Sequence, residues 1–256
     1  LLEWAREQGS DAVATGHYAR VEPFPPTGLP TLRRAVYVKK DQTYFLSHLG
    51  VDALSGFITP VGHLQKEDVR RVAREAGLPV AERSESQEIC FIADDNYRRF
   101  LQENSEDMGD SEDMAGEIVN MEGKALGRHA GIHHYTIGQR RGLGIGGSPE
   151  PIYVVELRPE TKQVVVGPNE ALFSKGLLAD KMHYGGLGEI REPTPVRVKI
   201  RYRSEAVNAT ATPEDKGSLR IVFKTPQRAV TPGQTAAVYD CEGEWVIGGG
   251  EIFKSL

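Results

Sequence analysis

Cysteine is scarce in this sequence of 256 residues, which contains only Cys90 and Cys241, 151 positions apart. Two such distant cysteines do not form a disulfide framework, and the absence of a Cys-x-x-Cys pair argues against a structural zinc site. Five of the seven histidines are scattered without the spacing of metal ligands, so we expect no metal site. This pattern is typical of a reducing cytoplasm, where we expect the protein to be located.

Long hydrophobic runs are also missing. No apolar stretch approaches the ~20 residues that a membrane span needs, and no signal peptide is visible. Hydrophobic residues make up 39% and charged residues 26%, as in ordinary globular proteins. The first residue is Leu1, and LLEWAREQ is typical of the last turns of a helix that ends at Gly9. We therefore expect the chain to be a fragment of a longer protein.

A cationic excess is likewise absent, since the formal net charge is −5, which is unusual for a nucleic-acid-binding protein. The charge is unevenly distributed, because residues 103–117 hold seven carboxylates and neither lysine nor arginine. Outside that run, 31 cations face 29 carboxylates. We interpret the run as a solvated loop, and we take the clusters of cations elsewhere as the better guide to phosphate binding.

The N-terminal part has the pattern of an α/β fold. A helix, a glycine turn and a strand over residues 11–15 are typical of an open, mostly parallel sheet, in which ligands lie at the carboxyl ends of strands. Gly16 follows this strand, where a backbone can approach a nucleotide closely or simply turn. A short strand is expected at 36–38, after a Pro-rich loop over 22–31, and an amphipathic helix over 65–76.

The C-terminal part reads as all β. Short apolar segments separated by Gly and Pro turns predict a hairpin and then a small β-barrel. We expect domain boundaries near 93 and 150, which gives three domains over residues 1–92, 93–150 and 151–256. The predicted strands lie at residues 152–157, 163–166, 196–202, 219–224, 235–239 and 244–247.

Cys90 is the candidate nucleophile. A thiol reacts as its thiolate, and the ordinary cysteine pKa is about 8.5. The polar run SESQE before Cys90 could supply backbone donors that favour the thiolate, and Phe91 and Ile92 could anchor it on a buried element. The alternative is an inert cysteine in the core. Its position alone leaves both interpretations open.

Three segments have the composition expected of a surface for an anionic polymer. Residues 131–147 combine six glycines with two histidines, two arginines and a glutamine, although a tight structural loop would look similar. In residues 196–203, the alternation of a strand places Arg197, Lys199, Arg201 and Arg203 on one face. These four cations would pair either with a nucleic-acid backbone or with protein carboxylates. Residues 39–42 (KKDQ) could hold a phosphate and read a base edge.

Seven motifs together resemble the tRNA-specific 2-thiouridylases, the MnmA family, whose members replace oxygen by sulfur at C2 of the wobble uridine. The motifs occur in family order over the whole chain. They are Ala14–Arg20, Lys40–Leu46, Ser86–Ile92, His134–Gly144, Arg201–Arg203, Thr231–Gln234 and Gly248–Gly250.

This resemblance implies the fold and the site. The fold would be α/β plus β: the C-terminal part of a PP-loop (adenine nucleotide alpha hydrolase-like) domain, a small central domain and a C-terminal β-barrel. Gly16 would contact ATP, which acts with Mg²⁺, and Cys90 would carry a persulfide received from a sulfur donor protein. A second cysteine would then leave a disulfide. The residues implied to contact tRNA are His17, Lys40, Asp41, Gln42, Arg201, Tyr202 and Gln234.

Two family features are missing from the sequence, namely the Ser-Gly-Gly-x-Asp-Ser phosphate loop and the first catalytic cysteine. Cys241 is no substitute, because YDCEG is typical of a hairpin turn in the barrel. An alternative is therefore a tRNA-binding module without catalytic activity. A third hypothesis is a redox switch through Cys90 and Cys241.

Overall fold

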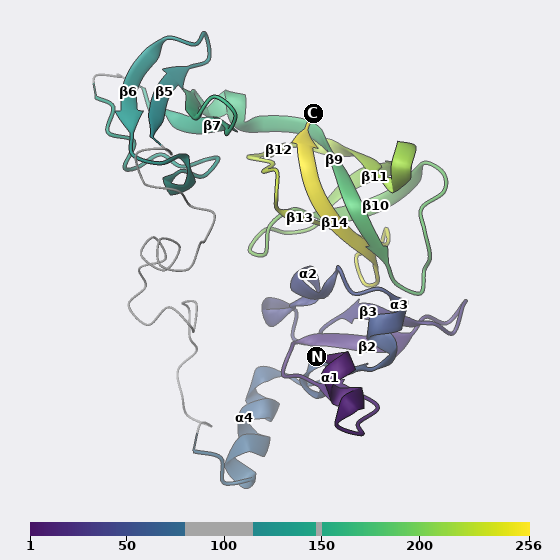
Figure 1. Cartoon of the computed structure of the whole chain (residues 1–256). Helices are drawn as coiled ribbons and strands as arrows, with labels where there is room; N and C mark the ends of the chain where they lie inside the picture. Colours follow the sequence, from purple (N-terminus) through teal and green to yellow (C-terminus); the bar gives the residue numbers. More distant parts are fainter. Residues whose placement is uncertain (80–114, 147–149) are drawn as a thin grey trace. The chain divides into compact units, whose positions relative to one another are not determined.

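The computed structural model describes residues 1–79, 115–146 and 150–256 (Figure 1). The described residues divide into two compact units. One unit combines the N-terminal residues up to 79 with Ser174–Leu256, and the other contains the described residues in between. Among the described residues, no helix has both the length and the apolar character that crossing a membrane requires.

The N-terminal segment of the first unit is a small α/β arrangement. Strand β1 (Val13–Ala14) pairs in parallel with β4 (Phe57–Ile58), as expected for a parallel sheet. The predicted N-terminal helix is present as α1 (Leu2–Glu7), and Gly9 follows it with a φ of 76°. The other elements are β2 (Ala19–Pro23), β3 (Pro30–Arg34), η1 (Val38–Lys40), α2 (Thr43–Leu46), α3 (Val51–Ser55), η2 (Pro60–His63) and α4 (Lys66–Glu75).

Local predictions in this segment were only partly correct. The strand expected at 36–38 is not formed, because the chain pairs earlier, as the antiparallel β2–β3 hairpin, and then enters the 3-10 helix η1. Pro30 is the first residue of β3, a position where its missing N–H is tolerated. The predicted helix over 65–76 is confirmed as α4, although none of its residues is buried.

The second unit contains one four-stranded sheet in the order β6-β5-β8-β7. Strands β5 and β8 are parallel, whereas the other neighbours are antiparallel. The predicted β7–β8 hairpin is present, but it joins this sheet and not the C-terminal barrel, because Val164 and Val166 are buried against Ile118 of β5. The elements are β5 (Gly116–Asn120), β6 (Ala125–His129), η4 (Ile132–His134), β7 (Tyr153–Arg158), β8 (Gln163–Gly167) and η5 (Asn169–Leu172).

The C-terminal part of the first unit is a closed barrel, which confirms the predicted β-barrel (Figure 1). Its strands follow the order β10-β11-β12-β9-β14-β13, and closure leaves none of these strands with an open edge. Alternating apolar residues fill the interior. The elements are β9 (Phe173–Tyr184), β10 (Thr194–Lys199), β11 (Val207–Pro213), η6 (Asp215–Gly217), β12 (Leu219–Arg228), β13 (Thr235–Tyr239) and β14 (Val246–Ser255).

A second core in this unit joins the N-terminal segment to the barrel. Tyr44, Leu46 and Leu54 pack with Tyr239 and Val246 in one buried cluster. Gly249 of β14 lies so close to α2 that an added Cβ would be 2.8 Å from the carbonyl carbon of Ser47. Gly249 therefore permits the close packing of the residue after α2 against β14, whereas Gly248 and Gly250 make room for the backbone of β9.

Candidate functional site

The structure describes every predicted site residue except Cys90, which lies outside the described residues. Gly16 and His17 lie two and three residues after the end of β1, at the carboxyl end of the parallel pair. Gly16 is exposed, has no positive φ, and an added Cβ would meet no atom within 4 Å. Its own packing therefore does not require glycine. His17 Nδ1 lies 2.9 Å from the hydroxyl of Thr15, which orients the ring.

Gln42 ties the segment after β1 to the start of α2. Its side-chain oxygen accepts a hydrogen bond of 2.9 Å from the backbone N–H of Tyr18. In return, the backbone N–H of Gln42 donates to the carbonyl of Tyr18 at 2.8 Å. This pair of bonds places Gly16 and His17 beside the Lys40–Gln42 segment, although the two are more than twenty positions apart in the sequence.

Asp41 is a buried anion with several internal partners. Its side chain is only 2% exposed. One carboxylate oxygen accepts from the backbone N–H of Ala35 at 3.0 Å, and the other accepts from the hydroxyl of Thr43 at 2.6 Å. The guanidinium of Arg34 lies 3.7 Å away. Charge-assisted bonds of this kind are strong in a buried setting, so Asp41 fixes the turn that carries Lys40 and Gln42.

Tyr44 connects this turn to two distant parts of the barrel. Its hydroxyl lies 3.4 Å from the carbonyl oxygen of Thr235 and 3.5 Å from that of Ile200, and its single hydrogen is shared between these two acceptors. Ile200 directly precedes Arg201 and Tyr202, and Thr235 directly follows Gln234. Contacts through a single tyrosine thus bring together three predicted sites that lie up to 194 positions apart in the sequence.

The predicted face of four cations is only partly formed. Strand β10 ends at Lys199, so Arg201 and Arg203 lie in the turn that follows. Lys199 is 9% exposed, and burial lowers the pKa of its ammonium, while Asp41 acts in the opposite direction. Arg201 donates to the carbonyl of Ala229. Arg203 alone of the four is exposed. The prediction of one strand over residues 196–202 was wrong at its end, because the chain turns after Lys199 although the alternation of apolar and charged residues continues.

The Gly-rich segment 131–147 belongs to the other unit and is described up to 146. Its Gln139 side chain is used internally, since it accepts from the N–H of Thr136 at 3.0 Å and donates to the carbonyl of Arg141 at 2.9 Å. Arg140 and Arg141 are exposed, whereas Leu143 is buried in the core. The segment is therefore a structured loop that presents two arginines.

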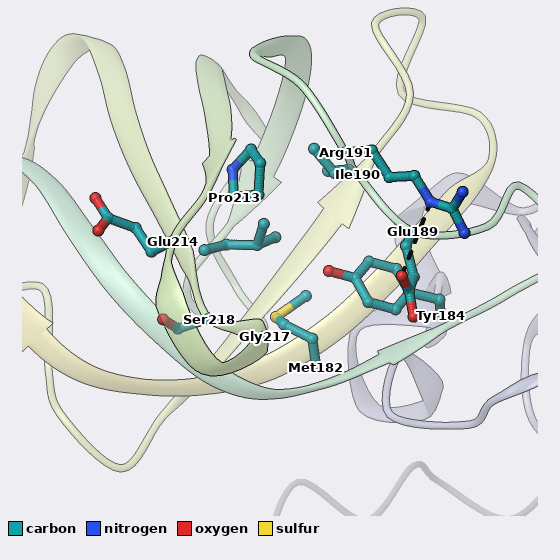
Figure 2. Close-up of a pocket in the computed structure, with 10 residues that line it drawn as sticks. Met182, Tyr184, Glu189, Ile190, Arg191, Pro213, Glu214, Gly217 and Ser218 are labelled. Atoms are coloured by element: carbon teal, nitrogen blue, oxygen red, sulfur yellow. Dashed lines mark ion pairs between the residues drawn. The ribbon is translucent and has the colours of Figure 1, made fainter.

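A pocket of about 360 Å³ lies between β9, the loop after it and the turn that joins β11 to β12 (Figure 2). Its wall combines apolar side chains with the charged pair Glu189 and Arg191, which are 4.0 Å apart. Burial raises the pKa of the Tyr184 hydroxyl in this wall, and the charge of Glu189 adds to that effect. None of the predicted site residues lines the pocket.

Comparison with known proteins gives matches over the whole chain. Three family models match in order: a tRNA methyl transferase HUP domain over residues 1–94, a tRNA methyl transferase PRC-barrel domain over 100–168 and an aminomethyltransferase β-barrel domain over 174–252. The tRNA-specific 2-thiouridylase MnmA of Halothermothrix orenii is 44% identical over 256 residues, which is 100% of this chain and 69% of that protein. The chain belongs to the tRNA-specific 2-thiouridylase family.

Other relatives agree with this assignment. The MnmA proteins of Koribacter versatilis and Pelobacter propionicus are 42% and 44% identical over 98% and 100% of this chain, and the matches cover 68% and 70% of those proteins. The domain descriptions speak of methyl transferases, but each covers only one part of the chain, so the full-length relatives decide the family. Family membership confirms the resemblance, and the HUP, central and barrel domains confirm the predicted layout.

Several residues that organise this candidate site were not singled out from the sequence. Tyr44, Phe45 and His48 all lie in or just after the Lys40–Leu46 motif. Their role depends on contacts with the barrel about 150 to 190 positions away, which no local pattern reveals. The aromatic pair Tyr44-Phe45 beside a cationic segment was the one available signal.

The surroundings of His48 predict that stability depends on pH. Its Nε2 lies 3.0 Å from the hydroxyl of Thr235, and its ring centroid is 6.1 Å from that of His183. Burial lowers the pKa of His48 and the charge of His183 lowers it further, while Glu251 raises it. The unfolded chain then binds more protons than the folded chain below about pH 6.5.

We therefore expect the free energy of unfolding to fall as pH drops below about 6.5 and to be fully present above that pH. Urea unfolding of His48→Gln between pH 5 and pH 8 should give a flatter profile than the unsubstituted protein. His129, whose pKa is also lowered by burial, still titrates in this variant. His63→Gln is the control. Its ring is 55% exposed and lies 3.8 Å from Glu22, a surface contact that contributes little, so this variant should keep nearly the full pH dependence. Equal slopes for His48→Gln and the control would contradict the assignment.

Proposed function

We propose that the protein catalyses ATP-dependent 2-thiolation of the wobble uridine of tRNA, with a persulfide on Cys90 as the sulfur carrier. Membership of the family supports the reaction and the substrate. The observation that carries the proposal is the arrangement around Tyr44, which brings Lys40–Gln42, Arg201–Tyr202 and Gln234 onto one part of the first unit. The cytoplasm is the compartment that this proposal implies.

The proposed chemistry proceeds in two stages. The C2 oxygen of uridine is a poor leaving group, so ATP first adenylates it, and pyrophosphate leaves. The terminal sulfur of the Cys90 persulfide then attacks C2, and the oxygen departs with AMP. A second thiol attacks the Cys90 sulfur, which releases the thiolated base and leaves a disulfide for an external reductant. A persulfide donor protein reloads Cys90.

Among the described residues, Gly16 is the position that fits a contact with ATP. Gly16 is exposed at the carboxyl end of a parallel strand, with open space where a side chain would be, so a nucleotide can approach its backbone. Among the residues that the structure describes, no group of three or more His, Cys, Asp or Glu side chains could hold a metal ion. Mg²⁺ would thus arrive with the triphosphate, which it neutralises.

The residues predicted to contact tRNA divide into two roles. Lys40, Arg201, Tyr202 and Gln234 would contact the RNA, together with His17. Asp41 and the side chain of Gln42 are already bonded within the protein, so we propose that they position the Lys40 segment. RNA of this kind is recognised through its backbone and its unpaired bases, since the major groove of an RNA helix is too narrow to read.

The alternative is a tRNA-binding module without catalytic activity. The discriminating experiment incubates the purified chain with tRNA, ATP, Mg²⁺, a persulfide donor and an excess of a small-molecule thiol, which can act both as the second thiol and as the reductant. The 2-thiouridine formed is then measured by mass spectrometry of the digested tRNA. Formation of 2-thiouridine supports the enzyme. Micromolar tRNA binding with no 2-thiouridine supports the module, and the absence of both contradicts the two hypotheses together.

The turn after β10 provides a test of the RNA contacts. Each lost phosphate contact reduces the slope of log K against log salt by roughly 0.7–0.9, so Arg201→Ala with Arg203→Ala should flatten the slope by about one to two units. Arg203→Ala alone should give about half of this change without disturbing the bond from Arg201 to Ala229. Tm and the salt dependence of tRNA binding are measured together.

Arg191→Ala is the matched control, because its side chain is 85% exposed on the same barrel and lines a pocket without predicted site residues. It should leave the slope unchanged. A lower Tm with an unchanged slope for the double variant would mean that these arginines stabilise the barrel and do not contact the RNA.

A further inference from the structure

Phe45 is an unusual member of α2. The other three residues of this short helix, Thr43, Tyr44 and Leu46, are all buried, whereas the side chain of Phe45 is 54% exposed. Single exposed apolar residues are common on protein surfaces, so exposure alone does not give Phe45 a function. Its surroundings therefore decide whether it has a function.

Phe45 does not stand alone, because Tyr202 of the barrel lies against it. The two ring centroids are 4.5 Å apart, with planes inclined by 36°. Tyr44 packs edge-on against Phe45 at 5.6 Å. The pair is thus formed by two segments far apart in the sequence, and the buried core that joins the N-terminal segment to the barrel holds it in place.

One cation lies beside this aromatic pair, and two more occur close to it in the sequence. The ammonium of Lys199 lies 5.5 Å from the centre of the Tyr202 ring and 6.0 Å from that of Tyr44, within cation–π range. Lys199 is 9% exposed, so it supports the rings from inside the protein. Arg203 directly follows Tyr202, and Lys39 precedes α2 by a few residues; both are exposed. An apolar partner protein would gain little from these charges, whereas a polyanion with unpaired bases fits both features.

We propose that Phe45 and Tyr202 form a stacking platform for one unpaired base of the tRNA loop that carries the target uridine. This inference rests on the proposed function and adds Phe45 to its contacts. Aromatic side chains stack on any base, and each such contact contributes strongly to the binding of single-stranded nucleic acid. The platform would hold a neighbouring base while the target uridine leaves its stack.

The test uses the whole chain and an RNA stem-loop with a uridine at the wobble position. Phe45→Ala should weaken binding by about fivefold to a hundredfold, the loss of one stacked base. Phe45→Tyr keeps the ring and should bind within about twofold of the unsubstituted protein. Phe45→Leu keeps an apolar side chain without a π face and should bind as weakly as Phe45→Ala. Phe253→Ala, which removes a phenylalanine that is 44% exposed on β14, is the control for surface apolar loss.

A second measurement identifies the base. Loop bases are replaced one at a time by the fluorescent analogue 2-aminopurine, whose emission falls when it is stacked. One position should be quenched by the unsubstituted protein and recover with Phe45→Ala, while the salt slope of binding stays unchanged because no charge is lost.

Full affinity of Phe45→Ala or Phe45→Leu for the stem-loop would overturn the platform but leave the proposed function intact. Absence of RNA binding by the unsubstituted protein would instead refute the proposed function itself. Melting curves of the variants check that each is folded.

Discussion

Cys90→Ser is expected to abolish 2-thiouridine formation while leaving tRNA affinity within about twofold. Replacing sulfur by oxygen removes the group that carries the persulfide, and loss of a catalytic nucleophile reduces rates by roughly 10⁴-fold or more. The RNA contacts proposed above do not involve this residue, so binding should survive. The measurement is mass spectrometry of nucleosides after incubation with ATP, Mg²⁺, a persulfide donor and an excess of a small-molecule thiol, with tRNA affinity determined in parallel.

Cys241→Ser is the matched control. Cys241 is a free, exposed thiol in the turn between β13 and β14, as predicted from the sequence. Its removal should leave thiolation nearly unchanged. Substantial thiolation by Cys90→Ser would contradict the assignment of Cys90 as the persulfide carrier. Loss of activity in both variants would instead favour the redox pairing of the two cysteines.

Asp41→Ala is expected to reduce the free energy of unfolding by about 3 kcal/mol. The substitution leaves the N–H of Ala35 and the hydroxyl of Thr43 without their buried acceptor, and it removes the anion nearest to Arg34. Breaking a buried charged network from one side costs about 3–5 kcal/mol, and the lower end applies because Arg34 is partly exposed. Urea unfolding followed by circular dichroism measures the change.

Two variants separate the causes of this loss. Asp41→Asn keeps an acceptor oxygen and should lose less than Asp41→Ala, whereas Asp11→Ala, at an exposed position, should change stability by at most about 0.5 kcal/mol. Since Asp41 positions the Lys40 segment, both variants at position 41 should also bind tRNA more weakly, and Asp41→Ala should lose more affinity than Asp41→Asn. Unchanged stability with strongly reduced affinity would instead mean that the Asp41 carboxylate contacts the RNA.

The sequence was informative where the signal was local. The helix α4, the β7–β8 hairpin and the turn at Cys241 follow from apolar periodicity and turn residues, and the structure contains all three. The closed barrel followed from short strands at regular spacing. Strands β9 and β11 were missed, because polar and small residues interrupt their apolar pattern.

The sequence was less informative where the structure of a segment depends on contacts with distant segments. The β7–β8 hairpin was predicted, but its pairing with β5 depends on burial that local alternation does not encode. Likewise, four cations in alternation predicted one exposed basic face, whereas Lys199 is buried beneath the Tyr44 and Tyr202 rings. The motif residues of the candidate site were found from the sequence, Tyr44 among them, but the contacts by which Tyr44 joins the other motifs were not.

Hydrogen exchange of the chain with and without tRNA tests the central claim most directly, namely that the segments joined by Tyr44 form one RNA-binding surface. We predict that added tRNA slows amide exchange together in residues 38–46, 200–204 and 231–235, while exchange around the pocket at residues 189–191 is unchanged. Protection confined to other parts of the chain, or protection of only one of the three segments, would contradict the claim.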